Sequence, residues 1–375
     1  MGSSNRNRRI DILRAITIIL IVMYHEGRFP PGLFWTSKFF PFNTYIICLF
    51  FFISGYLFKP FELKRTAKFL LNKTKHLAIP FLCWNLVYGI IVYFIDTHAS
   101  SPFSYLPPAE DVFTIRRLLI TPFFHGHQYV LNLATWFVGT LYPAIIIYGI
   151  LNAFGRKYIP EWAWLLFYSA TAILALTFLQ SNSDFLPVNR ISYALFFIQF
   201  GRCYKIYFEK ILERIPSYAY LSVLFIVQYL ICRKVDVQSY VIAFNTFNDD
   251  VITPLACGIL GILICMRLSR IIETYIVENK LERLISGNTW SIMTHHILVK
   301  FVFTYIIIRI GLEPDPNAGQ MFHDSIWYIP SIINYYILVT ISVAVPIIWQ
   351  LFFNQIKSGS QKLAVRCYNA MRRKQ

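Results

Sequence analysis

The sequence has little charge and no separate polar region. Charged residues make up only 14% of the 375 residues, whereas about 25% is usual in a soluble domain. Hydrophobic residues account for 56% and aromatic residues for 18%, above the roughly 45–50% apolar content of soluble domains. The scarcity of charge argues against a soluble enzyme and favours one integral membrane domain.

The seven cysteines lack the spacing of a disulfide framework or a zinc site. There is no Cys-x-x-Cys pair, and most cysteines lie in or beside apolar segments, where cysteine acts as a small hydrophobe. His125 and His127 offer two metal ligands, but no third ligand follows at suitable spacing. We therefore expect no metal and no resident cofactor. The first apolar run also lacks the cleavage site of a signal peptide.

Long apolar runs dominate the chain instead. A membrane-spanning helix needs about 20 mostly apolar residues, and such runs predict an all-α polytopic membrane helix bundle of about ten transmembrane helices. The sixth run is interrupted by Arg190 and Gln199, and the seventh is short. The ten predicted spans are residues 10–28, 41–58, 77–95, 133–151, 162–180, 190–207, 217–232, 251–267, 288–310 and 327–353.

The basic residues predict the orientation of this bundle. With ten spans, 25 Lys and Arg residues fall on the side of the two termini and 7 on the opposite side. Cytoplasmic loops are enriched in Lys and Arg, so both termini are expected in the cytoplasm and the protein in the plasma (inner) membrane. The net charge of +16 is therefore explained by the membrane topology, and no nucleic-acid partner is expected. Residues 1–356 form the predicted membrane domain, and 357–375 a basic cytoplasmic tail.

The first predicted span carries Arg14 and His25. The two are eleven residues apart, about three helical turns, so they share one face and lie about 16 Å apart along the helix axis. A charge inside a membrane helix costs at least about 2.5–3.5 kcal/mol on insertion scales, and such residues are usually functional. Structural alternatives remain open: Arg14 snorkels to the interface or pairs with Asp11, and His25 is an interfacial polar residue.

The ninth predicted span holds a second polar pair. His296 and Lys300 are four residues apart, so they share a helix face with Thr289 and Thr304. A lysine well inside a span is costly unless it faces a polar cavity. We expect His296 and Lys300 to line the same polar path as His25, or else to pair with polar groups of another span.

Five segments resemble, in order, the acyltransferase-3 family of integral membrane O-acyltransferases. The segment IDILRAITIILIVMYH is similar to the family's first-helix signature, in which ten residues separate an arginine from a histidine. Lys73 and His76 stand where the family often has two arginines, and they offer point donors in place of a planar fork. The other matching segments are FFFISGYLF (50–58), KTKHLAIPF (73–81), WFVGTLY (136–142) and NTWSIMTHHILV (288–299).

The resemblance implies transfer of an acyl group, usually acetyl from acetyl-CoA, to a hydroxyl of a glycan or a lipid-linked saccharide. Acyl-CoA is then a co-substrate held at the cytoplasmic side by cations and by close backbone approach at a glycine. His25 acts as general base or carries the acyl group briefly, and the sequence does not separate these roles. Arg14 is implied in catalysis with His25 and in holding the donor. The other implied donor-site residues are Ser54, Gly55, Lys73 and His76, and His296 and Lys300 are implied in the tunnel or acceptor site.

Two other classes fit ten spans with buried charges: a transporter or flippase of lipid-linked saccharides, and a non-catalytic receptor or scaffold. Transporters often contain inverted repeats with helices broken by Gly or Pro at matching positions. We find no such repeat, so the acyltransferase is the preferred hypothesis.

Overall fold

The computed structural model describes residues 7–26, 39–98, 113–126, 129–179, 183–235, 241–244, 250–312 and 335–372. Within these ranges the chain is helical and contains no β-strand, which confirms the all-α prediction. Residues 27–28 of the first predicted span and 327–334 of the last lie outside the described ranges, as does His127 of the predicted histidine pair.

Each of the ten predicted spans overlaps a helix of the described chain, although the boundaries differ. These ten helices are α1 (Arg8–His25), the short α3 (Ile46–Tyr56), α5 (Ile79–His98), α7 (Trp136–Gly155), α8 (Glu161–Leu179), α9 (Leu186–Cys203), α11 (Ser217–Lys234), α12 (Ile252–Tyr275), α14 (Thr289–Arg309) and α16 (Tyr335–Arg372). Shorter helical segments connect them: η1 (Phe42–Thr44), η2 (Leu63–Arg65), α4 (Thr66–Lys73), η3 (Thr74–Ala78), η5 (Arg116–Ile120), α6 (Thr121–Phe124), η6 (Val130–Thr135), η7 (Ser183–Phe185), η8 (Tyr204–Phe208), α10 (Glu209–Leu212), η10 (Ile242–Phe244) and α13 (Lys280–Gly287).

Membrane-spanning character is clear for part of this set. By length and composition, six helical segments of the described chain can cross a membrane: Leu63–Ile95, Val130–Gly155, Glu161–Leu179, Ile252–Tyr275, Thr289–Arg309 and Tyr335–Ser358. α1 has 18 residues but carries four charged side chains in its first two turns. A multi-pass membrane protein is therefore supported, and the count of ten and the cytoplasmic termini stay predictions.

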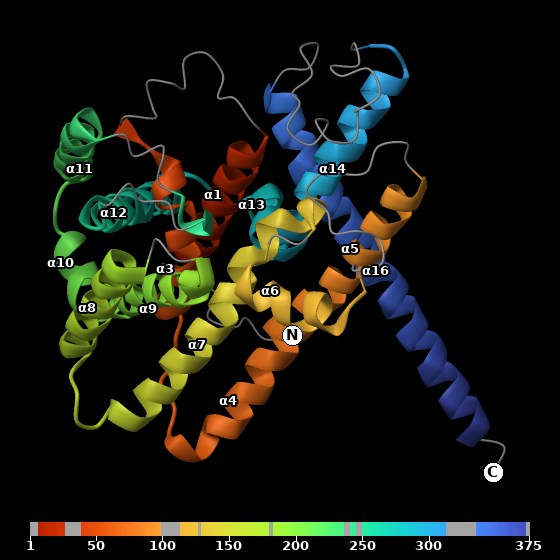
Figure 1. Cartoon of the computed structure of the whole chain (residues 1–375), viewed down its shortest axis with the longest axis horizontal. Helices are drawn as coiled ribbons and strands as arrows, with labels where there is room; N and C mark the ends of the chain where they lie inside the picture. The colour runs from red at the N-terminus through yellow and green to blue at the C-terminus, as the bar shows by residue number, and fades with distance from the viewer. Residues whose placement is uncertain are drawn as a thin grey trace.

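α1 lies in the middle of the bundle, between the α8–α12 group and the α5–α14–α16 group (Figure 1). It packs against α3, α12, α13, α14 and α16. The side chain of Asn7 caps its N-terminus by accepting a hydrogen bond from the amide of Ile10, and Leu13, Ile18 and Val22 are fully buried. Because protein packs around this helix, its polar side chains can meet groups on other helices.

α9, the weakest predicted span together with α11, is one of the most buried helices. It packs against α3, α7 and α8, and protein groups bind two of its polar side chains, Gln199 and Arg190. Gln199 accepts a hydrogen bond from the Tyr148 hydroxyl at 2.7 Å. The guanidinium of Arg190 donates to the carbonyl of His125 at 2.9 Å and lies 4.6 Å from the Trp136 ring centroid. Polar residues inside a span are tolerated where they face the bundle in this way.

Two glycines allow α3 and α9 to touch through their backbones. A Cβ atom added at Gly55 would lie 1.7 Å from the carbonyl oxygen of Ile198, and one at Gly201 would lie 2.1 Å from that of Phe52. Small residues at helix crossings are the usual means of close packing in membranes. Gly55 therefore serves the contact between two helices.

Two backbone features shape the periphery. The π-turn η3 ends at Ala78, two residues before Pro80, and contains His76, the residue four positions before this proline. Proline lacks an amide hydrogen and clashes with the carbonyl four residues earlier, so a widened turn at this point accommodates it. α16 continues without a break to Arg372 and projects beyond the bundle (Figure 1). The predicted boundary between membrane domain and tail, at residue 356, thus falls inside a continuous helix.

Candidate active site

A cavity of about 190 Å³ lies beside Arg14, between α1, α3, α7 and α14. The Arg14 side chain is 36% exposed, and its guanidinium lies 3.3 Å from the Asp11 carboxylate, so the pairing left open by the sequence is present. Ser54 and Thr289 line the wall, and the Ser54 hydroxyl donates a hydrogen bond to the carbonyl of Phe50 at 2.9 Å. The remaining lining is apolar: Phe50, Ile53, Leu77, Phe137, Val138, Leu141, Trp290 and Met293. One cation in an apolar chamber suits an anionic group attached to a slender apolar arm.

Three residues predicted at the donor site lie away from this cavity. The ammonium group of half-buried Lys73 lies 5.7 Å from the Phe69 ring centroid, and His76 is exposed. Gly55 faces α9, as described above. Leu77, which follows His76, does line the cavity. The structure therefore places Arg14 and Ser54 together, with Lys73 and His76 on the segment leading to them.

His25 and His296 meet at the end of α1. The Nε2 atom of His296 lies 3.0 Å from the Nδ1 atom of His25, and their ring centroids are 5.0 Å apart. One turn further along α14, the Lys300 ammonium donates a hydrogen bond to the carbonyl of His25 at 2.7 Å. His296 and Lys300 are both fully enclosed, with exposed fractions of 0% and 1%. The structure thus brings together three of the residues selected from the sequence.

Two further residues in this region escaped the sequence analysis. Glu26 is fully buried, and its carboxylate lies 4.0 Å from the Lys300 ammonium. Tyr335, at the start of α16, donates a hydrogen bond to the carbonyl of Met23 at 2.7 Å. Glu26 had a usable signal, because an acidic residue directly follows His25 at the end of an apolar run. Tyr335 had none, since its role depends on how α16 packs against α1.

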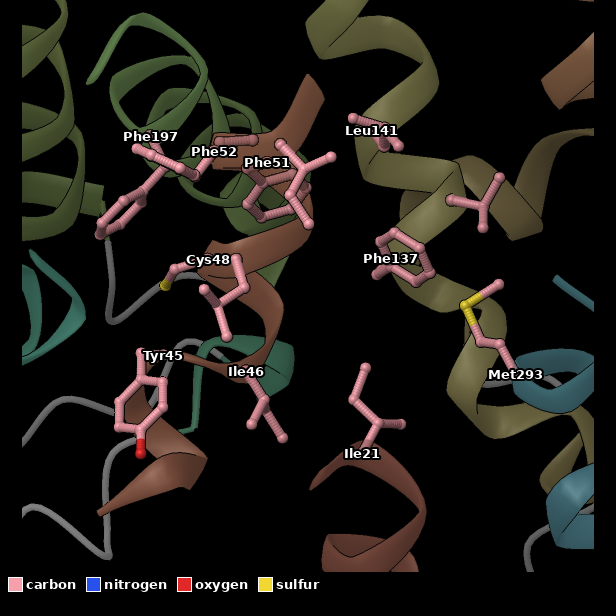
Figure 2. Close-up of a cluster of buried hydrophobic side chains, with 14 of the residues drawn as sticks. Ile21, Tyr45, Ile46, Cys48, Phe51, Phe52, Phe137, Leu141, Phe197 and Met293 are labelled. Atoms are coloured by element: carbon pink, nitrogen blue, oxygen red, sulfur yellow. The ribbon is translucent and has the colours of Figure 1, made fainter. Parts of the chain in front are cut away.

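The Arg14 cavity and the histidine pair occupy successive levels of the same two helices. Ile21 precedes His25 by one turn on α1, and Met293 precedes His296 by one turn on α14; both are buried, with 1% and 3% exposure. Met293 also lines the Arg14 cavity. Figure 2 shows Ile21, Met293 and Phe137 converging from three helices on a common space. Met293 thus links the Arg14 cavity to the turn of α14 that carries His296.

The basic residues that begin α1 are committed to ion pairs. Arg9 lies 3.0 Å from the Glu273 carboxylate on α12, and Arg8 lies 2.9 Å from Glu282 on α13. Burial alone would lower the pKa of Arg9, but hydrogen bonds and charge from Glu213 and Glu273 hold it above its ordinary value. Arg8 and Arg9 therefore anchor α1, and Arg14 is the arginine of this helix that reaches the cavity.

Among residues 7–26, 39–98, 113–126 and the other described ranges, no group of three His, Cys, Asp or Glu side chains is arranged to hold a metal ion. His125, the described member of the predicted histidine pair, contributes its carbonyl to Arg190.

Membrane-length helices, a histidine pair between α1 and α14 and a cavity beside one arginine indicate a multi-pass membrane protein with polar groups inside its bundle. The family profile described as an acyltransferase domain matches residues 7–350, nearly the whole chain. The chain belongs to the acyltransferase-3 family of membrane acyltransferases, which confirms the resemblance noted in its sequence. No curated protein and no solved structure matches the chain.

Proposed function

We propose that this protein is an O-acyltransferase of the plasma membrane. It moves an acyl group, acetyl in the simplest case, from cytoplasmic acyl-CoA to a hydroxyl of a cell-surface glycan or lipid-linked saccharide. The observation that carries the proposal is the arrangement of the Arg14 cavity and the His25–His296 pair at successive levels of α1 and α14. Family membership favours this function over the transporter alternative.

The donor binds at the Arg14 level. Coenzyme A is a polyanion, and Arg14 supplies a cation that the ligand's phosphates require. Ser54 and Thr289 offer hydroxyl groups in the same wall. Lys73 and His76 lie on the segment that leads to the cavity and attract the anion on its way in. The pantetheine arm passes Ile21 and Met293 and brings the thioester to His25.

The transfer takes place at His25. A sugar hydroxyl is a poor nucleophile near neutral pH and needs a base within hydrogen-bond reach. The imidazole takes the hydroxyl proton while the hydroxyl oxygen attacks the thioester carbonyl carbon. The carbon–sulfur bond then breaks, and the leaving thiolate receives the proton as free CoA. In the covalent variant, the imidazole first accepts the acyl group from sulfur and then passes it to the hydroxyl.

The experiment measures acyl transfer with purified protein in lipid nanodiscs, acetyl-CoA and glycan or lipid-linked saccharide from the host. Free thiol and the mass of the acceptor are recorded together. His25→Ala should lower turnover by about 10²–10⁴-fold, the usual contribution of a positioned general base, with little change in donor binding. His98→Ala, at the exposed end of α5, is the matched control. Near-normal transfer by folded His25→Ala protein would contradict the proposal.

A further inference from the structure

We infer that His296 is a positioning residue that fixes the tautomer of His25 and makes the Nε2 atom of His25 the reacting nitrogen. The inference rests on the proposed function in one respect, namely that His25 handles the proton or the acyl group. The tautomer itself follows from the hydrogen bonds around the two rings.

The backbone of α14 determines which nitrogen of His296 carries hydrogen. Its Nδ1 atom lies 2.9 Å from the carbonyl oxygen of Ile292 and 3.0 Å from that of Met293. Carbonyl oxygens only accept hydrogen bonds, so Nδ1 must be the donor, and a neutral imidazole has a single N–H. The opposite tautomer would direct a lone pair at two carbonyl oxygens in a fully buried site, where unmade hydrogen bonds are costly. The Nε2 atom of His296 is therefore an acceptor.

This acceptor then determines the tautomer of His25. His296 Nε2 lies 3.0 Å from His25 Nδ1, so Nδ1 of His25 donates its hydrogen to His296. The single N–H of a neutral His25 ring is thereby assigned to Nδ1, and Nε2 carries the lone pair. Both roles considered for His25, general base and acyl carrier, need that lone pair.

The backbone of His25 is held by neighbouring helices. Lys300 donates to the His25 carbonyl at 2.7 Å, which places a cation at the C-terminus of α1, where the helix dipole favours it. Tyr335 fixes the carbonyl of Met23 from α16. Among the described residues, two charged groups lie beside the His25 backbone: Lys300, which binds its carbonyl, and Glu26, the next residue, whose carboxylate is 4.0 Å from the Lys300 ammonium. When Nε2 takes up a proton, the ring becomes a cation, and its hydrogen bond to His296 becomes charge-assisted and stronger.

Substitutions at His296 separate positioning from packing. His296→Leu removes the acceptor, and His296→Gln keeps one through its amide oxygen. His295→Leu is the matched control on the adjacent residue, because His295 hydrogen-bonds to Tyr88 of α5 at 3.0 Å. We expect His296→Leu to lower turnover by about 10²–10³-fold with the Michaelis constant for acyl-CoA changed less than twofold. The turnover of His296→Gln should be at least about tenfold higher than that of His296→Leu, and the turnover of His295→Leu should lie within about threefold of the parent value.

A second readout needs no activity. The protein has eight histidines, and ¹⁵N-histidine NMR in nanodiscs distinguishes protonated from unprotonated ring nitrogens; the His25 signals are those lost in His25→Ala. In the parent, Nδ1 of His25 should be protonated and Nε2 unprotonated. His296→Leu should populate the opposite tautomer, and His295→Leu should not.

Either readout can overturn the inference. A parent spectrum with Nε2 of His25 protonated and Nδ1 unprotonated would refute it, and so would near-parental turnover in folded His296→Leu protein. If His296→Leu does not fold, the parent spectrum and the His296→Gln variant decide. If the parent transfers no acyl group to any hydroxyl, the proposed function fails, while the spectrum still decides the tautomer.

Discussion

Replacing Gly55 by alanine tests how α3 and α9 are held together. The added methyl carbon would lie 1.7 Å from the carbonyl oxygen of Ile198 and 2.5 Å from its carbonyl carbon. Both atoms belong to the backbone of a buried helix, so no side-chain rotation relieves the overlap. The two helices must separate, or one of them must shift along its axis.

The size of the effect follows from that geometry. Ordinary van der Waals contact begins near 3.4 Å, so the gap must open by up to 1.7 Å. A gap of about 0.5–1 Å between two atoms in contact already removes a quarter to a half of their dispersion energy. Overpacking typically costs about 1–3 kcal/mol, and a backbone clash belongs at or above the top of that range. The intrinsic gain of about 0.5–1 kcal/mol for alanine over glycine in a helix does not offset it.

Thermal unfolding in detergent measures this loss, and a thiol-reactive dye is a suitable reporter. Cys48 on α3 and Cys203 on α9 are free and buried, so separation of the helices should expose them at lower temperature. Gly287→Ala on α13 is the matched control, because nothing lies within 4 Å of its added carbon. We expect an unchanged or slightly higher midpoint for Gly287→Ala and a clear loss for Gly55→Ala.

The same variant distinguishes packing from ligand binding. If Gly55 provided close backbone approach for acyl-CoA, Gly55→Ala would fold normally and raise the Michaelis constant for the donor. A folded Gly55→Ala protein with an unchanged unfolding midpoint would refute the packing argument. Loss of thermal stability without ligand present would support it.

Three further predictions follow from the site and the charge pattern. Arg14→Gln should raise the Michaelis constant for acyl-CoA by about tenfold with a smaller change in turnover, because the charge binds the ground state and the transition state alike. An unchanged Michaelis constant for acyl-CoA would show that Arg14 does not bind the donor. Lys300→Met should lower the free energy of unfolding by about 3–5 kcal/mol, because it leaves the Glu26 carboxylate buried and without its ion-pair partner. The double variant Lys300→Met with Glu26→Gln should recover part of that loss in a thermal unfolding experiment. For topology, an impermeant thiol reagent should label Ser183→Cys and not Lys157→Cys in intact cells, and the reverse pattern would overturn the orientation.

The sequence by itself determined the class of fold and the polar positions on two helices. Apolar run length is a local property, so the helices fell where composition placed them. The shared face of Arg14 and His25 follows from helical periodicity, and so does that of His296 and Lys300. The ordered family segments indicate the acyltransferase class without any tertiary contact.

The tertiary structure decided which of these residues meet. Gly55 faces α9 and not the cavity. The packing of the other α3 side chains sets how this helix is rotated about its axis, and the glycine itself does not. The hydrogen bond between His25 and His296 joins residues 271 positions apart, and Glu26 becomes part of the site only because Lys300 arrives from another helix. Such contacts depend on the packing of whole helices against one another, which local composition and periodicity do not encode.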